Sequence, residues 1–170
     1  LDQDMPFIVE PVGYPIKEDK RGFARIKPQL VVETAKQITA LPVDILKAEF
    51  PADLEDEKDK NKLLDLCREL DQASRVPWVI LSAGISYDIF CQQVEIACQA
   101  GASGFLAGRA LWQEATQASR KEYPNFLETI VVKRLEKLIE LANAYGTPWY
   151  TKLGASEVDE NWHKSYSPLA

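Results

Sequence analysis

The stretch Asp44-Ile45-Leu46-Lys47-Ala48-Glu49-Phe50 places a lysine inside an apolar run that has the length of a β-strand. Burying an ammonium group is costly unless the group is paired or neutralised. Two ordinary explanations are a salt bridge between Lys47 and Glu49, and a strand edge from which the Lys47 side chain reaches water. A third is that Lys47 takes part in chemistry, and the rest of the chain favours this interpretation.

The composition is that of an acidic, folded protein. The 170 residues are 46% hydrophobic and carry a net charge of −6, which suits one domain or part of a larger one. The negative charge argues against a nucleic-acid partner, and no apolar run is long enough to cross a bilayer. The three cysteines have no metal-binding spacing and fit reduced thiols. With no signal-peptide pattern at the start, we expect a cytoplasmic protein without a membrane partner, metal or cofactor.

Four short apolar runs predict buried strands, and helical spacing follows each of them. The runs lie within Pro6–Tyr14, Asp44–Phe50, Pro77–Leu81 and Gly104–Ala107. After a charged loop over residues 15–27, helices are predicted at Pro28–Leu41, Glu55–Ser74, Tyr87–Gln99, Ala110–Ser119 and Asn125–Ala144. This alternation predicts an α/β fold with a parallel sheet, in which right-handed connections bury the strands on both faces.

The unusual polar residues fall at the carboxyl ends of the four predicted strands. They are Glu10, Lys47, Ser82 and Arg109, in chain order. Polar side chains gathered at that end are typical of a (β/α)8 barrel enzyme. An open, doubly wound sheet would also bind its ligand there, so this pattern alone leaves both architectures open.

A lysine at a strand end suits Schiff-base chemistry. Free lysine has a pKa of about 10.4, and desolvation can lower it to about 7–8, where a neutral amine attacks a carbonyl. The resulting iminium is an electron sink that allows the neighbouring carbon–carbon bond to break. Glu10, on the preceding strand, is placed to move the protons. Glu49 lies two residues from Lys47 and so points the same way on a strand, where it could tune Lys47 or share the proton transfer.

The last two strand ends suggest an anion site. Ser82-Ala83-Gly84 supplies a hydroxyl and backbone N–H groups just before a predicted helix. Gly108-Arg109 adds a guanidinium suited to phosphate or sulfonate. In barrels, the loops after strands seven and eight form the usual phosphate site. If the last two strands of this chain are strands seven and eight of a barrel, the Lys47 strand is number six and the Glu10 strand number five. Each motif is common alone, whereas the ordered set on four successive strand ends is far less so.

Four segments resemble a known family. They are Val9-Glu10-Pro11, Asp44-Ile45-Leu46-Lys47-Ala48-Glu49, Pro77-Trp78-Val79-Ile80-Leu81-Ser82-Ala83-Gly84 and Gly101-Ala102-Ser103-Gly104-Phe105-Leu106-Ala107-Gly108-Arg109-Ala110-Leu111-Trp112. They are similar to the class I tagatose-bisphosphate aldolases and to the related sulfofructosephosphate aldolases. The sequences of the last two segments are closer to the sulfofructosephosphate aldolases. The resemblance covers about residues 5–145.

The resemblance implies a (β/α)8 TIM barrel of which residues 1–145 supply strands five to eight. It implies a class I aldolase that cleaves a phosphorylated or sulfonated ketose to dihydroxyacetone phosphate and an aldehyde, with Lys47 as the Schiff-base lysine and Glu10 as the acid/base residue. The phosphate or sulfonate group and its surroundings are assigned to Ser82, Ala83, Gly84, Leu106, Gly108 and Arg109. The other class considered is a non-catalytic anion-binding or assembly subunit.

Half a barrel exposes two unpaired strand edges. We expect the missing half to come from a longer chain that contains these residues; the alternatives are a second polypeptide and a second copy. We also expect an oligomer. Residues 146–170 form a predicted extended tail with aromatic residues, docked on its own domain or on a partner. The single histidine, His163, is expected at the tail surface, which makes a metal-dependent aldolase unexpected.

Overall fold

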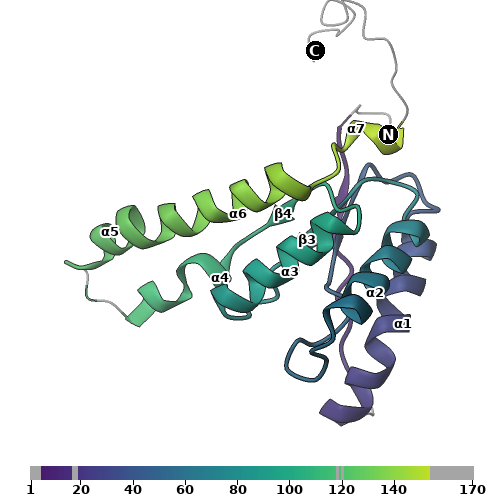
Figure 1. The fold of residues 1–170 in the computed structure, drawn as a ribbon, viewed down its shortest axis with the longest axis horizontal. Coiled ribbons are helices and arrows are strands. Elements are labelled where there is room, and N and C mark those ends of the chain that lie inside the picture. The colour runs from purple at the N-terminus through teal and green to yellow at the C-terminus, as the bar shows by residue number, and fades with distance from the viewer. Residues whose placement is uncertain (1–4, 17–18, 118, 120, 154–170) are drawn as a thin grey trace, which may run out of the picture.

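Four parallel strands form a single sheet in the computed structural model, which describes residues 5–16, 19–117, 119 and 121–153 (Figure 1). The strands are β1 (Ile8–Val9), β2 (Ile45–Ala48), β3 (Trp78–Leu81) and β4 (Phe105–Leu106). They are hydrogen-bonded in chain order, so β1 and β4 are the two edges of the sheet. The predicted α/β fold with a parallel sheet is confirmed, and it fits a TIM-barrel-type architecture.

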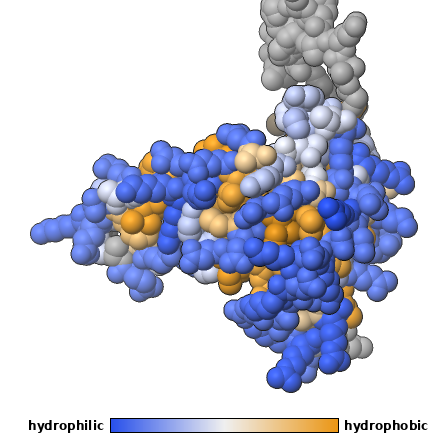
Figure 2. Space-filling model, in the orientation of Figure 1, coloured by the Kyte–Doolittle hydropathy of each residue, from blue (hydrophilic) through white to orange (hydrophobic). Residues whose placement is uncertain are grey.

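Helices follow every strand. They are α1 (Lys20–Ile38), α2 (Lys60–Ala73), α3 (Tyr87–Gln99), α4 (Arg109–Trp112), the 3-10 helix η1 (Gln113–Gln117), α5 (Tyr123–Phe126), the π-helix η2 (Leu127–Val131), α6 (Val132–Tyr145) and α7 (Tyr150–Leu153). Successive long helices contact one another, α1 with α2, α2 with α3 and α3 with α6. Hydrophilic side chains cover most of the helical face in Figure 2, with hydrophobic patches between them. No described helix is long and apolar enough to span a bilayer.

The core lies between the sheet and these helices. Alternate residues of the central strands are buried against the helices, and the residues between them, such as Ile45 and Lys47, are only half-buried. The main buried side chains are Leu46, Ala48, Trp78 and Ile80 from the sheet, and Leu63, Cys67, Leu70, Phe90, Val94 and Leu138 from the helices. Because side chains alternate between the faces of a strand, Lys47 belongs to the face that the helices leave uncovered.

The predicted loop over residues 15–27 is wrong in its second half. Helix α1 begins at Lys20, because the Asp19 carboxylate accepts a hydrogen bond of 2.7 Å from the Gly22 backbone N–H and caps the helix. Pro28, which the prediction placed in the first turn, lies inside α1. A proline there removes one helical hydrogen bond, and the helix continues through it because Val31 and Ala35 are buried in the core.

Two other helix boundaries also differ from the prediction. Helix α2 starts at Lys60 instead of Glu55, since Asp59 is its N-cap and accepts from the Asn61 and Lys62 backbone N–H groups. The predicted helix at Ala110–Ser119 is a short α-helix followed by a 3-10 helix, and the last long helix contains a π-helical turn. The prediction for α3, Tyr87–Gln99, is confirmed.

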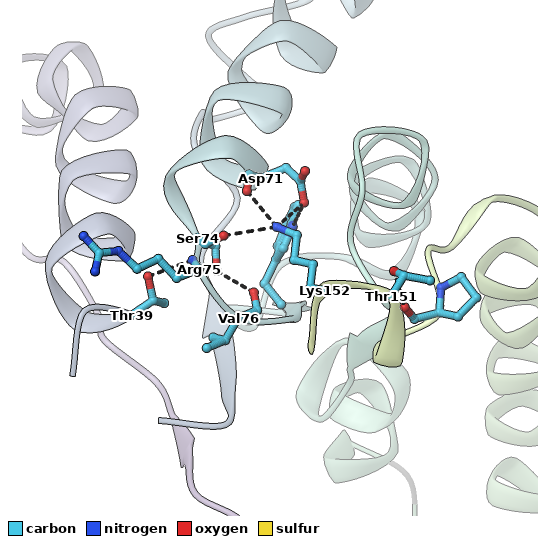
Figure 3. Close-up of polar contacts among 9 residues, drawn as sticks. Thr39, Asp71, Ser74, Arg75, Val76, Thr151 and Lys152 are labelled. Atoms are coloured by element: carbon cyan, nitrogen blue, oxygen red, sulfur yellow. Dashed lines mark hydrogen bonds and ion pairs between the residues drawn. The ribbon is translucent and has the colours of Figure 1, made fainter. Parts of the chain in front are cut away.

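The chain beyond α6 folds back onto the amino-terminal end of the sheet (Figure 3). The Thr147 backbone N–H donates to the Ala102 carbonyl at 2.9 Å. The Lys152 ammonium then contacts the Asp71 carboxylate at 2.7 Å and donates to the carbonyls of Asp71 and Ser74 at 2.7 and 3.2 Å. These carbonyls close α2, where helical partners are missing. The prediction of an extended tail is therefore wrong for Tyr150–Leu153, which form α7, and the contacts of Thr147 and Lys152 are with the chain's own domain. Residues 154–170, with His163, lie outside the described residues.

Candidate active site

Lys47 and Glu10 form an ion pair at the carboxyl end of the sheet. The register places Val9 level with Leu46, so the next residue, Glu10, comes level with Lys47 on the same face. Lys47 Nζ lies 2.7 Å from Glu10 Oε2, and the Lys47 side chain is 23% exposed. The salt bridge that the sequence first suggested, between Lys47 and Glu49, is replaced by this pair across two strands.

Glu49 has a different partner. Its Oε2 atom accepts a hydrogen bond of 2.7 Å from the Gly13 backbone N–H. Gly13 belongs to the loop between β1 and α1, so this carboxylate fastens that loop to the end of β2. A Cβ at Gly13 would lie 3.3 Å from Glu49 Oε2, which shows how closely the loop approaches. Glu49 lines the same groove as Lys47, but its carboxylate holds the loop between β1 and α1 through the Gly13 N–H.

The turn after β3 is sharply bent. Ala83 and Gly84 both have positive φ angles, 48° and 72°, and the Ile85 N–H donates to the Ser82 carbonyl at 3.1 Å. Ser82 is buried, and its hydroxyl accepts a long hydrogen bond of 3.5 Å from the Gly108 N–H. Ser82 therefore links the turn after β3 to the turn after β4, the two segments that the sequence assigned to anion binding.

Arg109 lies against the glycine of that turn. A Cβ placed on Gly84 would stand 2.9 Å from Arg109 Cζ, so the guanidinium occupies the space that a side chain would fill. Among the described residues, Arg109 forms no ion pair. A hydroxyl, backbone N–H groups and an unpaired guanidinium thus meet in one place, which is chemistry suited to an oxyanion.

The candidate site residues line one groove of about 640 Å³. The groove contains every residue that the sequence analysis singled out: Glu10, Lys47, Glu49, Ser82, Ala83, Gly84, Leu106, Gly108 and Arg109. It also contains residues that were not singled out: Val12, Leu81, Ala107 and Trp112. Trp112 was detectable in principle, because it lies three residues after Arg109 and so shares a helix face with it. A separate cavity of about 270 Å³ beside α1 contains neither Lys47 nor Arg109.

Comparison with known proteins shows that most of the chain matches one protein family. Residues 2–114 match the family described as DeoC/LacD family aldolase. The chain belongs to this aldolase family. The matched region contains all four strands and the whole groove, so the family assignment and the geometry refer to the same part of the molecule. Within the described residues, no group of three or more His, Cys, Asp or Glu side chains could hold a metal ion.

Curated relatives of this chain include several tagatose 1,6-diphosphate aldolases. The one from Streptococcus agalactiae is 30% identical over 86% of this chain and 51% of its own length. The one from Staphylococcus epidermidis is 30% identical over 88% of this chain and 52% of its own. Tagatose 1,6-diphosphate aldolase 2 from Enterococcus faecalis is 28% identical over 92% of this chain and 53% of its own. The chain spans about half the length of the curated relatives it matches.

Proposed function

We propose that this chain is strands five to eight of a (β/α)8 class I aldolase, which cleaves a phosphorylated or sulfonated ketose to dihydroxyacetone phosphate and an aldehyde. The observation that carries the proposal is the 2.7 Å contact between Lys47 Nζ and Glu10 Oε2 in a groove that also holds Arg109. A nucleophile, a proton-transfer group and an anion site are the three parts that such a reaction requires.

The ion pair supplies both forms that the first step needs. Transfer of one proton from Lys47 to Glu10 yields a neutral amine and a carboxylic acid. The amine attacks the ketose carbonyl carbon to form a carbinolamine, and the Glu10 acid protonates the departing hydroxyl, which leaves as water. The product is an iminium on Lys47, with Glu10 again a carboxylate that can accept a proton.

Carbon–carbon cleavage follows from that state. The Glu10 carboxylate removes the proton of the substrate hydroxyl, the adjacent carbon–carbon bond breaks, and its electron pair moves into the iminium to form an enamine. The aldehyde departs. Protonation of the enamine and hydrolysis of the renewed iminium release the ketone product and restore Lys47. The turn at Ser82–Gly84 and Arg109 hold the substrate's phosphate or sulfonate throughout, so that the reacting carbon stays at Lys47.

The proposal of a half barrel rests on surfaces that lack a partner in the described chain. Large apolar side chains are exposed beside both edge strands and on α6. They are Phe7, Ile8 and Val12 near β1, Leu106 on β4, and Val132, Leu135 and Ile139 on α6. Eight strands close a barrel of this type, and the described residues form four. We assign strands one to four to a longer polypeptide that contains this chain, with a second polypeptide or a second copy as the alternatives.

Borohydride trapping tests the proposed chemistry. The complete protein is incubated with dihydroxyacetone phosphate and reduced, and the adduct is mapped by mass spectrometry. We expect a stable adduct on Lys47 that disappears in Lys47→Ala. Lys152→Gln is the matched control, because Lys152 has nearly the same exposure as Lys47 but lies at the other end of the sheet. Absence of any adduct in the complete protein would refute the Schiff-base mechanism.

The second candidate is a non-catalytic anion-binding or assembly subunit. Arg109 and the Ser82–Gly84 turn would serve such a role without the other half of the barrel. Binding of inorganic phosphate without any adduct on Lys47 would favour this candidate. Within enzymes, a transaldolase or another Schiff-base lyase would use the same lysine, and turnover across a panel of ketose phosphates and sulfonates separates these reactions from the proposed one.

A further inference from the structure

Arg134 lies on α6, outside the groove, and holds the helix that carries Arg109. Its Nη1 atom donates to the Leu111 carbonyl at 2.8 Å. The same guanidinium forms a two-pronged contact with the Glu114 carboxylate, with both N–O distances at 2.8 Å. The Arg134 side chain is 19% exposed. Two-pronged arginine–carboxylate contacts are among the strongest and most directional in proteins, so Arg134 fixes both α4 and η1.

Arg134 also binds the start of α3. Its guanidinium lies over the Tyr87 ring, 4.8 Å from the ring centre, and the Tyr87 hydroxyl donates to the Arg134 carbonyl at 3.2 Å. The Phe126 ring lies on α5, with its centre 6.0 Å from the guanidinium. Cation–π contacts of this kind contribute when the cation is partly shielded from water. One side chain therefore connects α3, α4 and η1 to α6.

Helix α4 requires such support. It has four residues, Arg109–Trp112, and a helix this short is unstable on its own. The Gln113 N–H donates to the Arg109 carbonyl, and Arg134 donates to the Leu111 carbonyl, close to the point where η1 follows α4. Ala110 and Leu111 anchor the helix in the core, and the Arg134 contact adds a directional hydrogen bond near its carboxyl end. The direction of Arg109, the first residue of α4, therefore depends on the contact that Arg134 makes at the other end.

The two elements that Arg134 connects carry the two sides of the anion site. Tyr87 is the first residue of α3 and comes three residues after Gly84. Arg109 is the first residue of α4 and lies against Gly84. We propose that Arg134 is a positioning residue, which sets the distance between the Ser82–Gly84 turn and the Arg109 guanidinium and thereby determines affinity for the substrate's anionic group. This inference rests on the proposed function of that site.

The pKa shifts of Glu114 and Arg134 favour an ion pair that persists around neutral pH. Hydrogen bonding to Arg134 holds the pKa of Glu114 below its ordinary value, and the carboxylate in turn raises the pKa of Arg134. Both partners therefore remain charged around neutral pH. The connection is present before substrate arrives, as preorganised binding requires.

The test compares two ligands of the complete protein that differ only in the phosphate. Borohydride trapping on Lys47 is measured against the concentration of dihydroxyacetone phosphate and of dihydroxyacetone. In Arg134→Met, we expect the half-saturating concentration of dihydroxyacetone phosphate to rise on the order of tenfold to a hundredfold, while that of dihydroxyacetone stays unchanged. Lys137→Met is the matched control, since Lys137 lies on the same helix and pairs with Glu140 at 3.2 Å on the exposed surface. It should behave like the parent.

Two further variants keep the test decisive if Arg134→Met does not fold. Arg134→Lys retains the charge but loses the two-pronged contact, and Glu114→Gln retains the Leu111 and Tyr87 contacts. For both variants we expect the half-saturating concentration of dihydroxyacetone phosphate to rise above that of the parent, but by less than the rise expected for Arg134→Met. An equal loss with both ligands, or no change with either, would overturn the inference.

Calorimetry with inorganic phosphate separates this inference from the proposed function. If the parent forms no adduct on Lys47, the Schiff-base proposal fails, and the phosphate titration still decides the role of Arg134. We expect weaker phosphate binding in Arg134→Met than in the parent and in Lys137→Met. Equal binding in all three proteins, or no binding by the parent, would overturn the positioning role.

Discussion

Two lysines at opposite ends of the sheet make nearly the same ion pair and differ in everything around it. Lys47 Nζ lies 2.7 Å from Glu10, and Lys152 Nζ lies 2.7 Å from Asp71. Their side chains are 23% and 22% exposed. Distance and burial therefore do not distinguish a residue of the candidate active site from a purely structural one.

The number of partners does distinguish them. Lys152 has three acceptors, the Asp71 carboxylate and the carbonyls of Asp71 and Ser74, which use all the protons of its ammonium. Asp71 is in turn held by the Trp78 indole N–H at 2.9 Å. Lys47 has Glu10 as its acceptor among the described residues, and the pair opens into the groove. A saturated ammonium stabilises the fold, whereas one with a single partner keeps protons and space available for a ligand.

Replacing each lysine by arginine should give the largest difference between the two sites. Lys47→Arg keeps a positive charge beside Glu10 but cannot form a Schiff base, so we expect complete loss of the borohydride adduct with stability changed by less than about 0.5 kcal/mol. Lys152→Arg should retain the adduct. Adduct yield by mass spectrometry and chemical denaturation measure the two effects. An adduct in Lys47→Arg at another lysine would assign the chemistry elsewhere.

The next effect concerns the partner of Lys47. Glu10→Gln removes the proposed proton-transfer group, so we expect turnover to fall by about 10² to 10⁴, while the adduct still forms on Lys47 but at a lower rate. Glu49→Gln is the control, because the Glu49 carboxylate already binds the Gly13 N–H, and its effect on turnover should be smaller. If Glu49→Gln causes the larger loss, Glu49 is the acid/base residue.

On the structural side, Lys152→Met should lower stability without touching the chemistry. The Asp71 and Ser74 carbonyls and the Asp71 carboxylate lose a charged donor, which costs about 1–3 kcal/mol. Urea denaturation measures the loss, and adduct formation on Lys47 should equal that of the parent. A parallel fall in adduct yield at saturating ligand would show that the two ends of the sheet are coupled.

Two glycines extend the comparison, since each contacts a charged side chain. A Cβ on Gly84 would lie 2.9 Å from Arg109 Cζ, and one on Gly101 would lie 2.5 Å from Asp71 Cγ. Gly84→Ala should displace the Arg109 guanidinium and weaken phosphate binding. Gly101→Ala should cost about 1–3 kcal/mol of stability, because Asp71 is held in place and the backbone has a φ of 120°. Calorimetry measures phosphate binding and denaturation measures stability. Weaker phosphate binding in Gly101→Ala together with unchanged binding in Gly84→Ala would contradict the assignment.

The smallest expected effect is the pH dependence of the stability that the Glu114–Arg134 pair contributes. The folded-state pKa of Glu114 lies below its ordinary value because of Arg134, so its contribution is complete above the unfolded pKa of about 4.3. It is lost as pH falls through the folded pKa. The pair is partly exposed, and its contribution should be about 1 kcal/mol or less. The stability difference between the parent and Glu114→Gln should therefore shrink between pH 7 and pH 3; a constant difference would contradict the prediction.

Much of the site could be predicted from sequence because its geometry follows from connectivity. Strands joined by right-handed helical crossovers all point the same way, so residues that follow them share one edge of the sheet. That rule alone brings Glu10, Lys47, Ser82 and Arg109 into a single groove. The start of α1 was missed although its signal was local, since Asp19 is a good N-cap three residues before Gly22 and the prediction gave more weight to Pro28.

The residues that meet at the carboxyl end of the sheet can be deduced from the amino-acid sequence, because the period of the apolar pattern and the direction of the strands define that edge. The partner of each charged side chain depends on the three-dimensional packing. Lys47 pairs with Glu10 instead of Glu49 because of strand register. Lys152 reaches the carbonyl of Asp71, 81 positions away, and Arg134 reaches Glu114 on another helix. Contacts between distant segments depend on packing in three dimensions, and no periodicity of the chain encodes them.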